Sequence, residues 1–366
     1  MSDKMNKVLI ATGGTGGHVF PAYGLAKHLT EKKINVEIVS DKRGIKYLKQ
    51  FDDIKISVIN TSSIYNRNFI QKSISLLIIA YSVLKSFFFL IGNRPNLVFG
   101  MGGYSSFPIC VVAKLLNIPF IVYENNLHIG KANRFLLPFA FKLFVARKEL
   151  TGVPKKYEKK IFQIGNIIRK EILNFNRNLD NIESEKKIKI LILGGSQAAK
   201  IFAEKLPKIL EKCHKDGVPL KIYQQCLPEQ KTFLLDLYNK INLDCEIFNF
   251  SNDIINYFSK VNLAITRAGS SMLAELINVK IPFISVPLPS SADNHQLKNA
   301  IYYEKNQYSY LIEEKNLDEK LLKLIKKINK DRSLLTQMIN KQKQYSDNTV
   351  YAIIDKEIDK LLDEKY

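Results

Sequence analysis

The sequence predicts an α/β protein built from two doubly wound, Rossmann-like domains. Segments typical of strands and helices alternate along the chain, as in a parallel sheet covered by helices on both faces. A glycine pair follows the first strand of each half, Gly13-Gly14 and Gly194-Gly195. The 366 residues also exceed the ~250–300 that a single hydrophobic core usually supports.

The first half contains seven strand-like segments. Apolar, β-branched runs predict strands at 8–12, 35–40, 56–60, 96–101, 120–124, 142–146 and 160–166, with helices between them, for instance at 23–31 and 108–116. A polar, Asn-rich passage at 174–185 follows. We therefore place the change of domain near 163–170 and divide the chain into an N-terminal domain, 1–165, and a C-terminal domain, 166–345.

The second half repeats this pattern. KIKILILGGSQAAKIFAEKL, at 187–206, predicts a strand, a Gly-Gly turn and a helix, and later strands are predicted at 220–226, 245–250, 263–267 and 282–287. The tail from Glu313 is Lys-rich and helical in period. Its last piece carries apolar residues on one face, which must dock on another element: Val350, Ile353, Ile354, Ile358, Leu361 and Leu362.

The composition is that of a soluble globular protein with an unusual charge. Hydrophobic residues make up 46% of the chain, while 55 Lys and Arg against 35 Asp and Glu give a net charge of +20. Such a charge suggests an anionic partner, although a Lys-rich solvated surface explains it equally well. The four cysteines lack zinc-site or disulfide spacing, and MSDKMNKVLI contains no apolar signal core, so we expect a cytoplasmic protein.

Residues 73–92 are long and apolar enough to resemble a membrane span. Lys85 lies well inside this segment, where a span would be penalised by ~2.5–3.5 kcal/mol. Its polar residues also share one helical face: Lys72, Ser75, Ser82, Lys85 and Ser86. We expect an amphipathic helix, either packed against a sheet or placed at a membrane interface.

Three glycine clusters follow predicted strands, at 13–17, 100–104 and 194–196. Ligands of open α/β sheets bind at the carboxyl ends of the strands, where glycine admits a close approach and a helix N-terminus attracts anions. Any one cluster could be only a tight turn. Three clusters spread over both domains favour the binding of a phosphorylated ligand.

Several familiar motifs are absent. The dinucleotide fingerprint G-x-G-x-x-G, begun at Gly14, fails at Val19, although Asp41 follows the second strand where a ribose-binding acid would lie. No GK[ST] follows the glycines, GGSQAA lacks the flanking glycine of a nucleophile elbow, and HExxH and DxDxDG do not occur. An NAD-dependent dehydrogenase is therefore disfavoured, and we expect no cofactor and no metal.

A second polar constellation occupies 264–300. A strand ends near Arg267, and Gly269 and Ser270 lead into a helix that carries Glu275. Glu275 could bind the hydroxyls of a ribose, and Gln296 could bind those of a sugar. Either residue could equally be an ordinary polar surface residue.

The quoted motifs resemble the MurG family of peripheral membrane N-acetylglucosaminyltransferases. GGTGGHVFPA, GMGGYSSFP, ENNLHIGKANR, IGNIIR, GGSQAA, RAGSSMLAE and DNHQLKNA occur in the family's order along essentially the whole chain. The resemblance implies the GT-B fold, with the C-terminal helix, 346–366, returning to the N-terminal domain. It also implies a role in peptidoglycan synthesis: transfer of GlcNAc from UDP-GlcNAc to undecaprenyl-pyrophosphoryl-MurNAc-pentapeptide (lipid I), which gives lipid II with inversion.

The resemblance also implies the site residues. The donor UDP-GlcNAc would be bound by Thr15, Gly16, Gly17, Asn126, Arg169, Ser196, Ser251, Ser270, Ser271, Met272, Leu273, Ala274, Glu275 and Gln296. Among these, Arg169 and Ser196 would hold the phosphates. The acceptor pyrophosphate would meet Gly13, Gly14, Gly102 and Gly103. The chain departs from the family's pattern at Tyr123, Asn125, Ala198 and Met272.

An inverting transfer requires a base beside the attacking 4-hydroxyl and donors for the charge that grows on UDP. His18 is the first candidate for the base, since an unperturbed histidine is largely neutral at pH 7. Glu124 is the second candidate. Alternatively, His18 orders the loop or binds a phosphate. Without a metal, Ser196, Arg169 and helix N-termini would stabilise the leaving diphosphate.

The expected partners follow from this reaction. They are UDP-GlcNAc, lipid I and an anionic membrane surface at the cytoplasmic face of the plasma (inner) membrane, with other cell-wall synthesis proteins as further candidates and no nucleic acid. Three alternatives remain open: a GT-B enzyme that glycosylates diacylglycerol or a polyprenol, a nicotinamide-dependent dehydrogenase, and a non-catalytic nucleotide-binding protein of the membrane surface.

Overall fold

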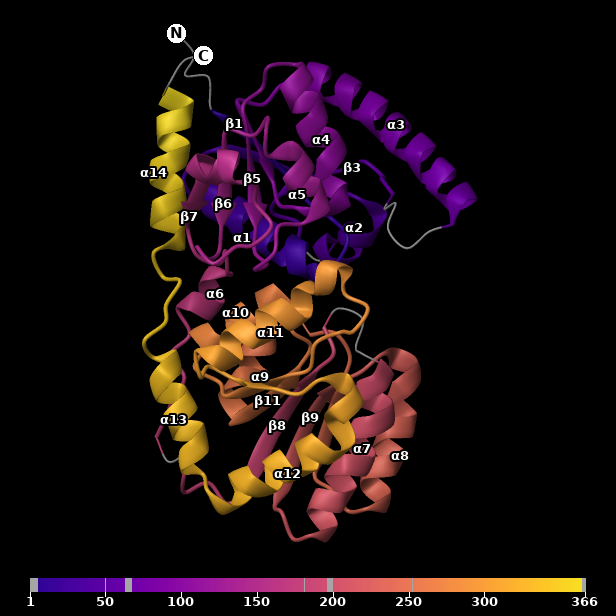
Figure 1. Cartoon of the computed structure of the whole chain (residues 1–366), viewed down its shortest axis with the longest axis vertical. Coiled ribbons are helices and arrows are strands. Elements are labelled where there is room, and N and C mark those ends of the chain that lie inside the picture. Colours follow the sequence, from indigo (N-terminus) through magenta and orange to yellow (C-terminus); the bar gives the residue numbers. More distant parts are fainter. Residues whose placement is uncertain are drawn as a thin grey trace. The chain divides into compact units, whose positions relative to one another are not determined.

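The computed structural model describes residues 6–49, 51–62, 68–180, 182–195, 200–251 and 253–363. The chain divides into two compact units (Figure 1). Unit 1 comprises residues 1–170 and 347–366, and unit 2 comprises residues 171–346. The sequence placed these changes at 165/166 and 345/346, within a few residues of the observed positions.

Unit 1 is built on a seven-stranded parallel sheet in the order β3-β2-β1-β4-β5-β6-β7. Its strands are β1 (Lys7–Ala11), β2 (Asn35–Ser40), β3 (Lys55–Val58), β4 (Leu97–Gly100), β5 (Phe120–Glu124), β6 (Lys142–Val145) and β7 (Ile161–Gln163). Val8 pairs with Val36 of β2 on one side and with Leu97 of β4 on the other. The strand order therefore reverses between β1 and β4, where doubly wound folds place their ligands.

The helices of unit 1 cover this sheet. They are α1 (Gly16–Glu31), α2 (Lys42–Leu48), α3 (Phe69–Gly92), α4 (Gly103–Leu115), α5 (Lys131–Leu136) and α14 (Val350–Asp363), with a 3₁₀ helix, η1 (Lys155–Lys160). Both α1 and α4 begin inside the glycine clusters, earlier than the sequence predicted. Pro21 lacks the N–H that would bond to the Gly17 carbonyl. Asn125 Nδ2 donates to that carbonyl instead, at 3.1 Å, so the helix tolerates the proline.

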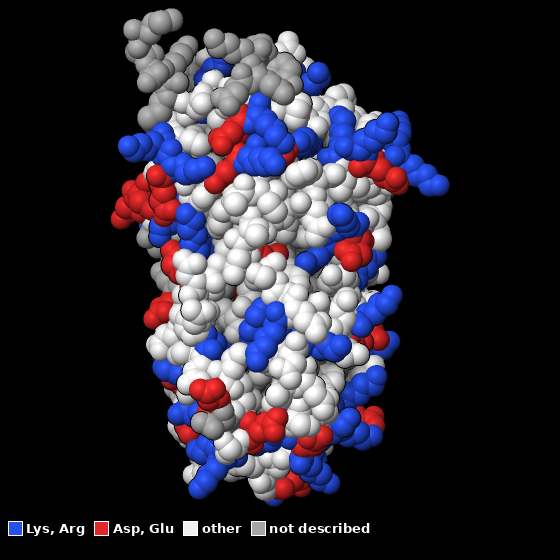
Figure 2. Space-filling model, turned by 90° about the vertical axis from the view of Figure 1, so that its left-hand side faces the viewer, with Lys and Arg blue, Asp and Glu red and all other residues white. Residues whose placement is uncertain are grey.

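The C-terminal helix α14 docks on unit 1, as the sequence predicted. Its residues Val350, Ile354 and Ile358 are fully buried. Asp355 lies 2.7 Å from His28 Nε2 of α1, and the buried Glu357 pairs with Lys142 at the start of β6. Basic and acidic side chains are mixed over the face that Figure 2 shows, so the positive charge forms no single patch there.

The two chain segments next to the unit boundaries, 166–168 and 347–351, are joined by hydrogen bonds within unit 1. Asp347 accepts hydrogen bonds from the backbone N–H of Asn166 at 3.0 Å and from its side chain at 3.1 Å. Tyr351 donates to the Ile168 carbonyl at 2.7 Å. The buried Tyr123 accepts from the Ile167 N–H at 3.0 Å, and burial raises the pKa of its hydroxyl. Tyr123 therefore holds the stretch before residue 170 against β5.

Helix α3 is amphipathic in an unusual sense. Its serines Ser75, Ser82 and Ser86 are fully buried. Each donates to the carbonyl four residues earlier, at 2.6–2.7 Å, which lets a polar face pack inward. Many of its apolar residues point outward, with Leu77 71% and Phe88 64% exposed, although Leu90 is buried in the core. The helix is long and apolar enough to cross a membrane, but its inward serine face shows that it packs on unit 1 as a surface helix.

Unit 2 repeats the architecture with a six-stranded parallel sheet in the order β10-β9-β8-β11-β12-β13. Its strands are β8 (Ile188–Leu193), β9 (Leu220–Gln225), β10 (Cys245–Phe248), β11 (Leu263–Thr266), β12 (Phe283–Ser285) and β13 (Tyr310–Leu311). The two-residue β13 was not predicted. The strand order reverses between β8 and β11, which creates a second ligand position of the same kind.

The helices of unit 2 flank that sheet. They are α6 (Lys170–Leu173), α7 (Lys200–Lys215), α8 (Lys231–Lys240), α9 (Ile254–Lys260), α10 (Ser270–Asn278), α11 (His295–Lys305), α12 (Leu317–Lys330) and α13 (Ser333–Gln342), with 3₁₀ helices η2 (Pro228–Gln230), η3 (Ala292–Asn294) and η4 (Glu314–Asn316). The buried faces of α7 and α12 meet the apolar strand β8 in one core. Burial of this apolar surface is the main source of the stability of unit 2.

Replacement of Glu357 by Gln should loosen α14. Burial alone would raise the pKa of Glu357, but hydrogen bonds from Lys142 and Lys360 outweigh burial and hold it below its usual value. The stabilisation is therefore complete above the pKa of an unfolded glutamate, ~4.3, and is lost as the pH falls through the lower folded value. At pH 7 we expect unit 1 to lose about 1–3 kcal/mol.

Urea unfolding of the Glu357→Gln variant at pH 7 and at pH 3.5 measures this loss. Asp359→Asn, at an exposed acidic residue of the same helix, is the matched control. An equal effect of the two substitutions at pH 7 would contradict the assigned role of the Glu357 pair.

Candidate active site

The carboxyl ends of β1, β4 and β5 meet at the point where the strand order of unit 1 reverses. The first glycine cluster follows β1, and the second connects β4 to α4. Thr15 is the N-cap residue of α1, and Gly16 and Gly17 form its first turn. The predicted residues of the two glycine clusters therefore lie at the same edge of the sheet.

A buried carboxylate organises this region. Asp41, at the N-terminus of α2, accepts hydrogen bonds at Oδ1 from the N–H groups of Gly14 and Gly44, each at 2.9 Å. Its Oδ2 accepts from Ser105 Oγ of α4 at 3.0 Å and from Arg43 Nε at 2.9 Å. Asp41 thus joins the first glycine cluster, α2 and α4. It is a scaffold residue, and the ribose-binding interpretation of Asp41 is wrong for this fold.

Burial would raise the pKa of Asp41, but the hydrogen bonds from Gly14, Gly44 and Arg43 outweigh burial and lower it. The carboxylate is therefore charged at neutral pH. The backbone of Gly13 lies close to Ser105 and Asp41. A Cβ atom at Gly13 would lie 2.6 Å from Ser105 Cβ and 2.7 Å from Asp41 Oδ1. Gly13 is consequently required here for steric reasons.

The hydrogen bond to Asp41 also changes what Gly14 can do. Its N–H is engaged at 2.9 Å and does not point to an incoming anion. The role of Gly14 toward the acceptor pyrophosphate therefore stays a prediction, and its amide would have to leave Asp41 to donate to that anion. Gly102 and Gly103, with φ of 86° and 73°, open the N-terminus of α4, and their role toward a pyrophosphate stays a prediction.

His18 lies in the first turn of α1 and faces the second glycine cluster. A side chain at Gly102 or Gly103 would come within 3.4 Å of its ring, so these glycines give the imidazole its space. Thr12 Oγ1 donates to the His18 carbonyl at 3.0 Å and fixes the backbone of this turn. His18 as a whole is half-buried, and its Nδ1 is buried.

Glu124, the second candidate for the base, is used as a scaffold. It is 3% exposed and accepts four hydrogen bonds. The N–H and Nδ2 of Asn126 donate to Oε1 at 3.1 and 3.0 Å, and the Gly130 N–H and Asn133 Nδ2 donate to Oε2 at 2.9 and 3.0 Å. These four donors tie the Glu124 carboxylate to the loop that follows β5, so it has a structural role here.

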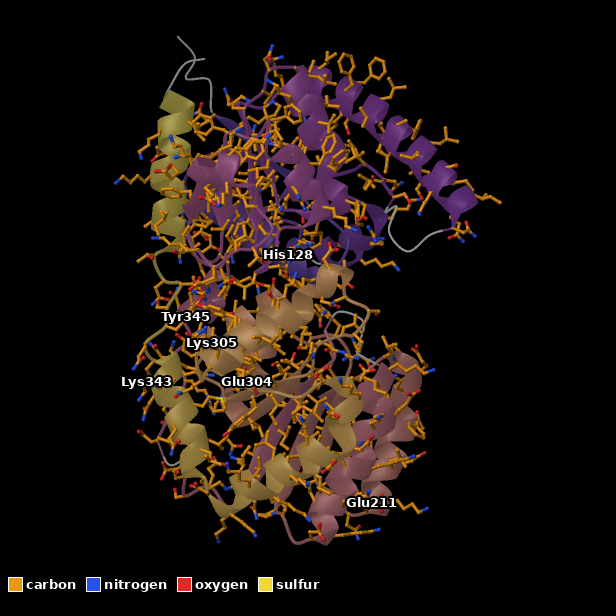
Figure 3. All side chains as sticks on the ribbon, viewed as in Figure 1. His128, Glu211, Glu304, Lys305, Lys343 and Tyr345 are labelled. Carbon is orange, nitrogen blue, oxygen red and sulfur yellow. The ribbon has the colours of Figure 1, made fainter. Side chains whose placement is uncertain are left out.

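The other predicted donor residues of unit 1 have defined surroundings. Asn126 Nδ2 also donates to Asn125 Oδ1 at 3.1 Å, so its amide belongs to the Glu124 network. Arg169 follows β7, and its guanidinium lies 5.3 Å from the centre of the Phe20 ring. His128, labelled in Figure 3, has Nδ1 2.9 Å from Thr151 Oγ1 and ties two loops together.

In unit 2 the predicted donor residues gather where β8 and β11 end. Gly194 and Gly195 follow β8, but Ser196 and Ala198 lie outside the described residues. Helix α10 opens directly after β11 with Ser270, which is buried, and Ser271, which is half-buried. The helix N-terminus therefore faces the carboxyl edge of the sheet, as a phosphate or nucleoside site requires.

The remaining residues of α10 differ in what they can offer. Leu273 and Ala274 are fully buried, so only their backbone could meet a ligand, whereas Met272 is half-buried. Glu275 is 6% exposed. It is not a solvated surface residue, which excludes one of the two interpretations considered for it.

Two further predicted residues lie on neighbouring loops. Gln296, in the first turn of α11, accepts the Leu288 N–H at Oε1 at 2.9 Å and so shapes the loop after β12. Ser251 lies three residues beyond the end of β10 and is half-buried. The nearby Arg267 is paired with Glu314 at 2.6 Å and donates to two loop carbonyls, so it has a structural role.

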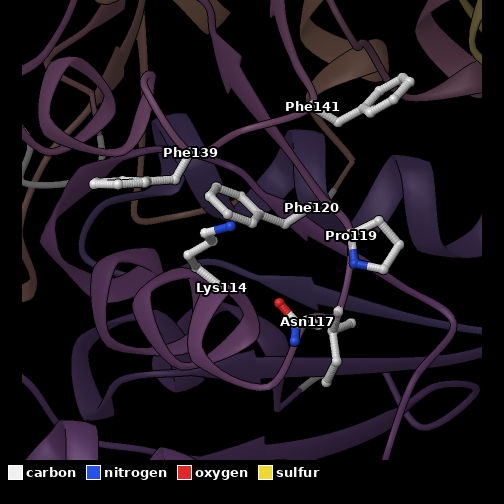
Figure 4. Close-up of a pocket in the computed structure, with 7 residues that line it drawn as sticks. Lys114, Asn117, Pro119, Phe120, Phe139 and Phe141 are labelled. Atoms are coloured by element: carbon white, nitrogen blue, oxygen red, sulfur yellow. The ribbon is translucent and has the colours of Figure 1, made fainter. Parts of the chain in front are cut away.

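A pocket of about 280 Å³ lies at the opposite, amino end of β5 and β6 (Figure 4). Phe120, Phe139 and Phe141 line it together with Lys114 of α4. It is separate from the carboxyl-edge residues described above. Among the residues that the structure describes, no cluster of His, Cys, Asp or Glu could hold a metal ion.

Residues 8–145 match the N-terminal domain model of glycosyltransferase family 28, and residues 189–355 match its C-terminal domain model. The chain is 36% identical over 348 residues to the UDP-N-acetylglucosamine--N-acetylmuramyl-(pentapeptide) pyrophosphoryl-undecaprenol N-acetylglucosamine transferase of Pelagibacter ubique (strain HTCC1062). That alignment covers 94% of this chain and 95% of the relative.

A transferase of the same name from Francisella tularensis subsp. holarctica (strain OSU18) is 34% identical over 345 residues, which are 92% of this chain and 93% of the relative. The crystal structure of Acinetobacter baumannii MurG superposes with a TM-score of 0.75 at 26% identity, covering 96% of this chain and 99% of that one. The two parallel sheets with alternating helices are those of a GT-B fold. This chain belongs to the MurG family of glycosyltransferases.

Proposed function

We propose that this chain transfers GlcNAc from UDP-GlcNAc to the MurNAc 4-hydroxyl of undecaprenyl-pyrophosphoryl-MurNAc-pentapeptide (lipid I) and forms lipid II with inversion. The observation that carries this proposal is the 36% identity, over 94% of the chain, to a transferase whose name states this donor group and this acceptor. The reaction is a step of peptidoglycan synthesis.

In this reaction the 4-hydroxyl attacks the anomeric carbon, the bond from that carbon to UDP breaks, and the hydroxyl proton passes to a base. His18 is the base in our account, because its ring borders the second glycine cluster at the carboxyl edge, while Glu124 accepts four hydrogen bonds from the loop after β5. Histidine is suited to this step because its neutral form predominates at pH 7.

The donor belongs to unit 2 in this proposal. The N-terminus of α10 and the glycine pair after β8 would receive the UDP moiety, with Glu275 on the ribose and Gln296 on the GlcNAc hydroxyls. Support comes from the burial of Glu275 in the second turn of that helix. The roles of Arg169, Ser196 and Ser251 stay predictions, as does the independence from metal ions.

Membrane association is part of the proposal. The outward face of α3 is apolar over its whole length, with Ile70, Leu77, Tyr81 and Phe88 each at least 64% exposed. Lys72 and Lys85 of the same helix are also exposed. Such a face would enter the lipid interface while the lysines meet anionic headgroups, each adding roughly 1 kcal/mol. Binding of this surface to the membrane would bring the enzyme to its lipid-linked acceptor.

A transfer assay tests the proposed function. Radiolabelled UDP-GlcNAc is supplied with a lipid I analogue that carries a short prenyl chain, and parallel reactions contain diacylglycerol or a polyprenyl phosphate. We expect labelled product only with the lipid I analogue, with equal rates in the presence and absence of EDTA. Transfer to diacylglycerol alone would reassign the acceptor, and loss of activity in EDTA would overturn metal independence.

Replacement of His18 by Ala should lower kcat by about 10²–10⁴-fold, the usual contribution of a general base. The KM for UDP-GlcNAc should change little, because the imidazole acts on the acceptor hydroxyl. A folded variant that loses less than tenfold in kcat would exclude His18 as the base.

Charged substitutions on α3 should weaken membrane binding. Leu77→Asp and Phe88→Asp are the variants, because both residues are exposed, whereas Leu90 of the same helix is buried in the core. Each should reduce binding to anionic vesicles by about tenfold or more, since burial of a large apolar side chain contributes ~1.5–3 kcal/mol.

Cosedimentation with vesicles that contain or lack anionic lipid, at low and high salt, measures the effect. Phe233→Asp, at a residue of α8 that is 54% exposed in unit 2, is the matched control and should bind normally. Equal binding of all variants, or equal binding to neutral and anionic vesicles, would contradict the membrane role of α3.

A further inference from the structure

Arg43 lies beside the first glycine cluster and has no assigned role. It is the second residue of α2. If a side chain is built at Gly14, Arg43 Nη2 lies 3.7 Å from its Cβ, and apart from the flanking residues no other described heavy atom comes within 4 Å. The open side of Gly14 is therefore bounded by a guanidinium.

Asp41 fixes the direction of this guanidinium. Arg43 Nε donates to Asp41 Oδ2 at 2.9 Å, and Nη2 lies 2.7 Å from the same oxygen. The carboxylate is 3% exposed and cannot move, because Gly14, Gly44 and Ser105 hold it as well. The Arg43 side chain is 57% exposed. Asp41 therefore holds the guanidinium in one orientation, and its remaining N–H donors face solvent.

The cluster needs such a cation if it is to receive an anion. The Gly14 N–H is already bonded to Asp41, and the buried negative charge beside it would repel a phosphate. The planar guanidinium both compensates that charge and offers paired donors that match phosphate oxygens. The exposed lysines of the same helix, Lys42 and Lys46, show no such orientation by a buried acid.

We propose that Arg43 binds the pyrophosphate of the lipid-linked acceptor at the first glycine cluster, and that Asp41 is the residue that positions it. The proposal rests on the function proposed above, because it takes the acceptor to be a prenyl pyrophosphate ester. It replaces the Gly14 amide with an arginine as the anion-binding group of this cluster.

The test compares Arg43→Ala and Arg43→Lys with Lys46→Ala, a control that removes one positive charge from the same helix. Steady-state rates are measured with UDP-GlcNAc and the short-chain lipid I analogue in detergent. Arg43→Ala should raise the acceptor KM by about tenfold to a hundredfold, the range of a charge-assisted hydrogen bond. The KM for UDP-GlcNAc should stay within twofold. Arg43→Lys should recover part of the loss, and Lys46→Ala should match the unaltered enzyme.

A double-variant comparison tests the positioning role of Asp41. Asp41→Asn keeps an oxygen for the two backbone N–H groups but removes the charge that orients Arg43. If Asp41 acts through Arg43, the double variant should have the same acceptor KM as Arg43→Ala alone. Additive effects in folded variants, checked by thermal unfolding, would refute the positioning role.

The outcomes separate this inference from the proposed function. An active enzyme whose Arg43→Ala and Lys46→Ala variants share one acceptor KM refutes the inference alone. A rise in the KM of Arg43→Ala for UDP-GlcNAc would assign Arg43 to the donor and refute the inference. Weaker binding of Arg43→Ala to vesicles without lipid I, as large as its loss toward the acceptor, would assign Arg43 to lipid headgroups and also refute it. An unaltered chain that transfers no GlcNAc to the analogue removes the proposed function and this inference together.

Discussion

The hydrogen bonds to the Asp41 carboxylate are the contacts on which the N-terminal half of the site depends. One buried group bonds to the Gly14 N–H after β1, the Gly44 N–H of α2 and the Ser105 hydroxyl of α4. These segments are far apart in sequence and share no strand, so the carboxylate fixes their mutual positions. Because a buried charge without partners is very costly, the pieces are held in the one arrangement that satisfies it.

Glu124 organises the neighbouring strand end in the same way, with donors from Asn126, Gly130 and Asn133. Both buried acids of the site are thereby engaged in structure rather than in chemistry. In our proposal the groups that act on the substrate are the half-buried imidazole of His18 and the exposed guanidinium of Arg43. In this proposal the buried carboxylates are paired with structural donors, so their charge does not prevent the site from binding an anionic acceptor.

The fold was predictable because its signals are local. Strands β1 and β8 are mostly apolar runs, and the one-sided apolar pattern of α14 required a docking surface. The role of Asp41 was not predictable, since a ribose-binding acid occupies the same place after the second strand in dinucleotide-binding folds, and only the long-range contacts distinguish the two. The sequence likewise showed that the serines of α3 share a face but not that this face turns inward. Bonds from each serine to its own helix satisfy the hydroxyls and so permit this burial.

The most direct measurement is amide hydrogen exchange at Gly14 and Gly44 in Asp41→Ala, with Asp41→Asn as the variant that keeps an acceptor oxygen. If the carboxylate holds these segments, both amides should exchange at least about tenfold faster in Asp41→Ala. Amides of β1 and α14 should keep their protection, and Asp41→Asn should lie between the two. Unchanged exchange at Gly14 and Gly44 in a folded Asp41→Ala protein would contradict the account.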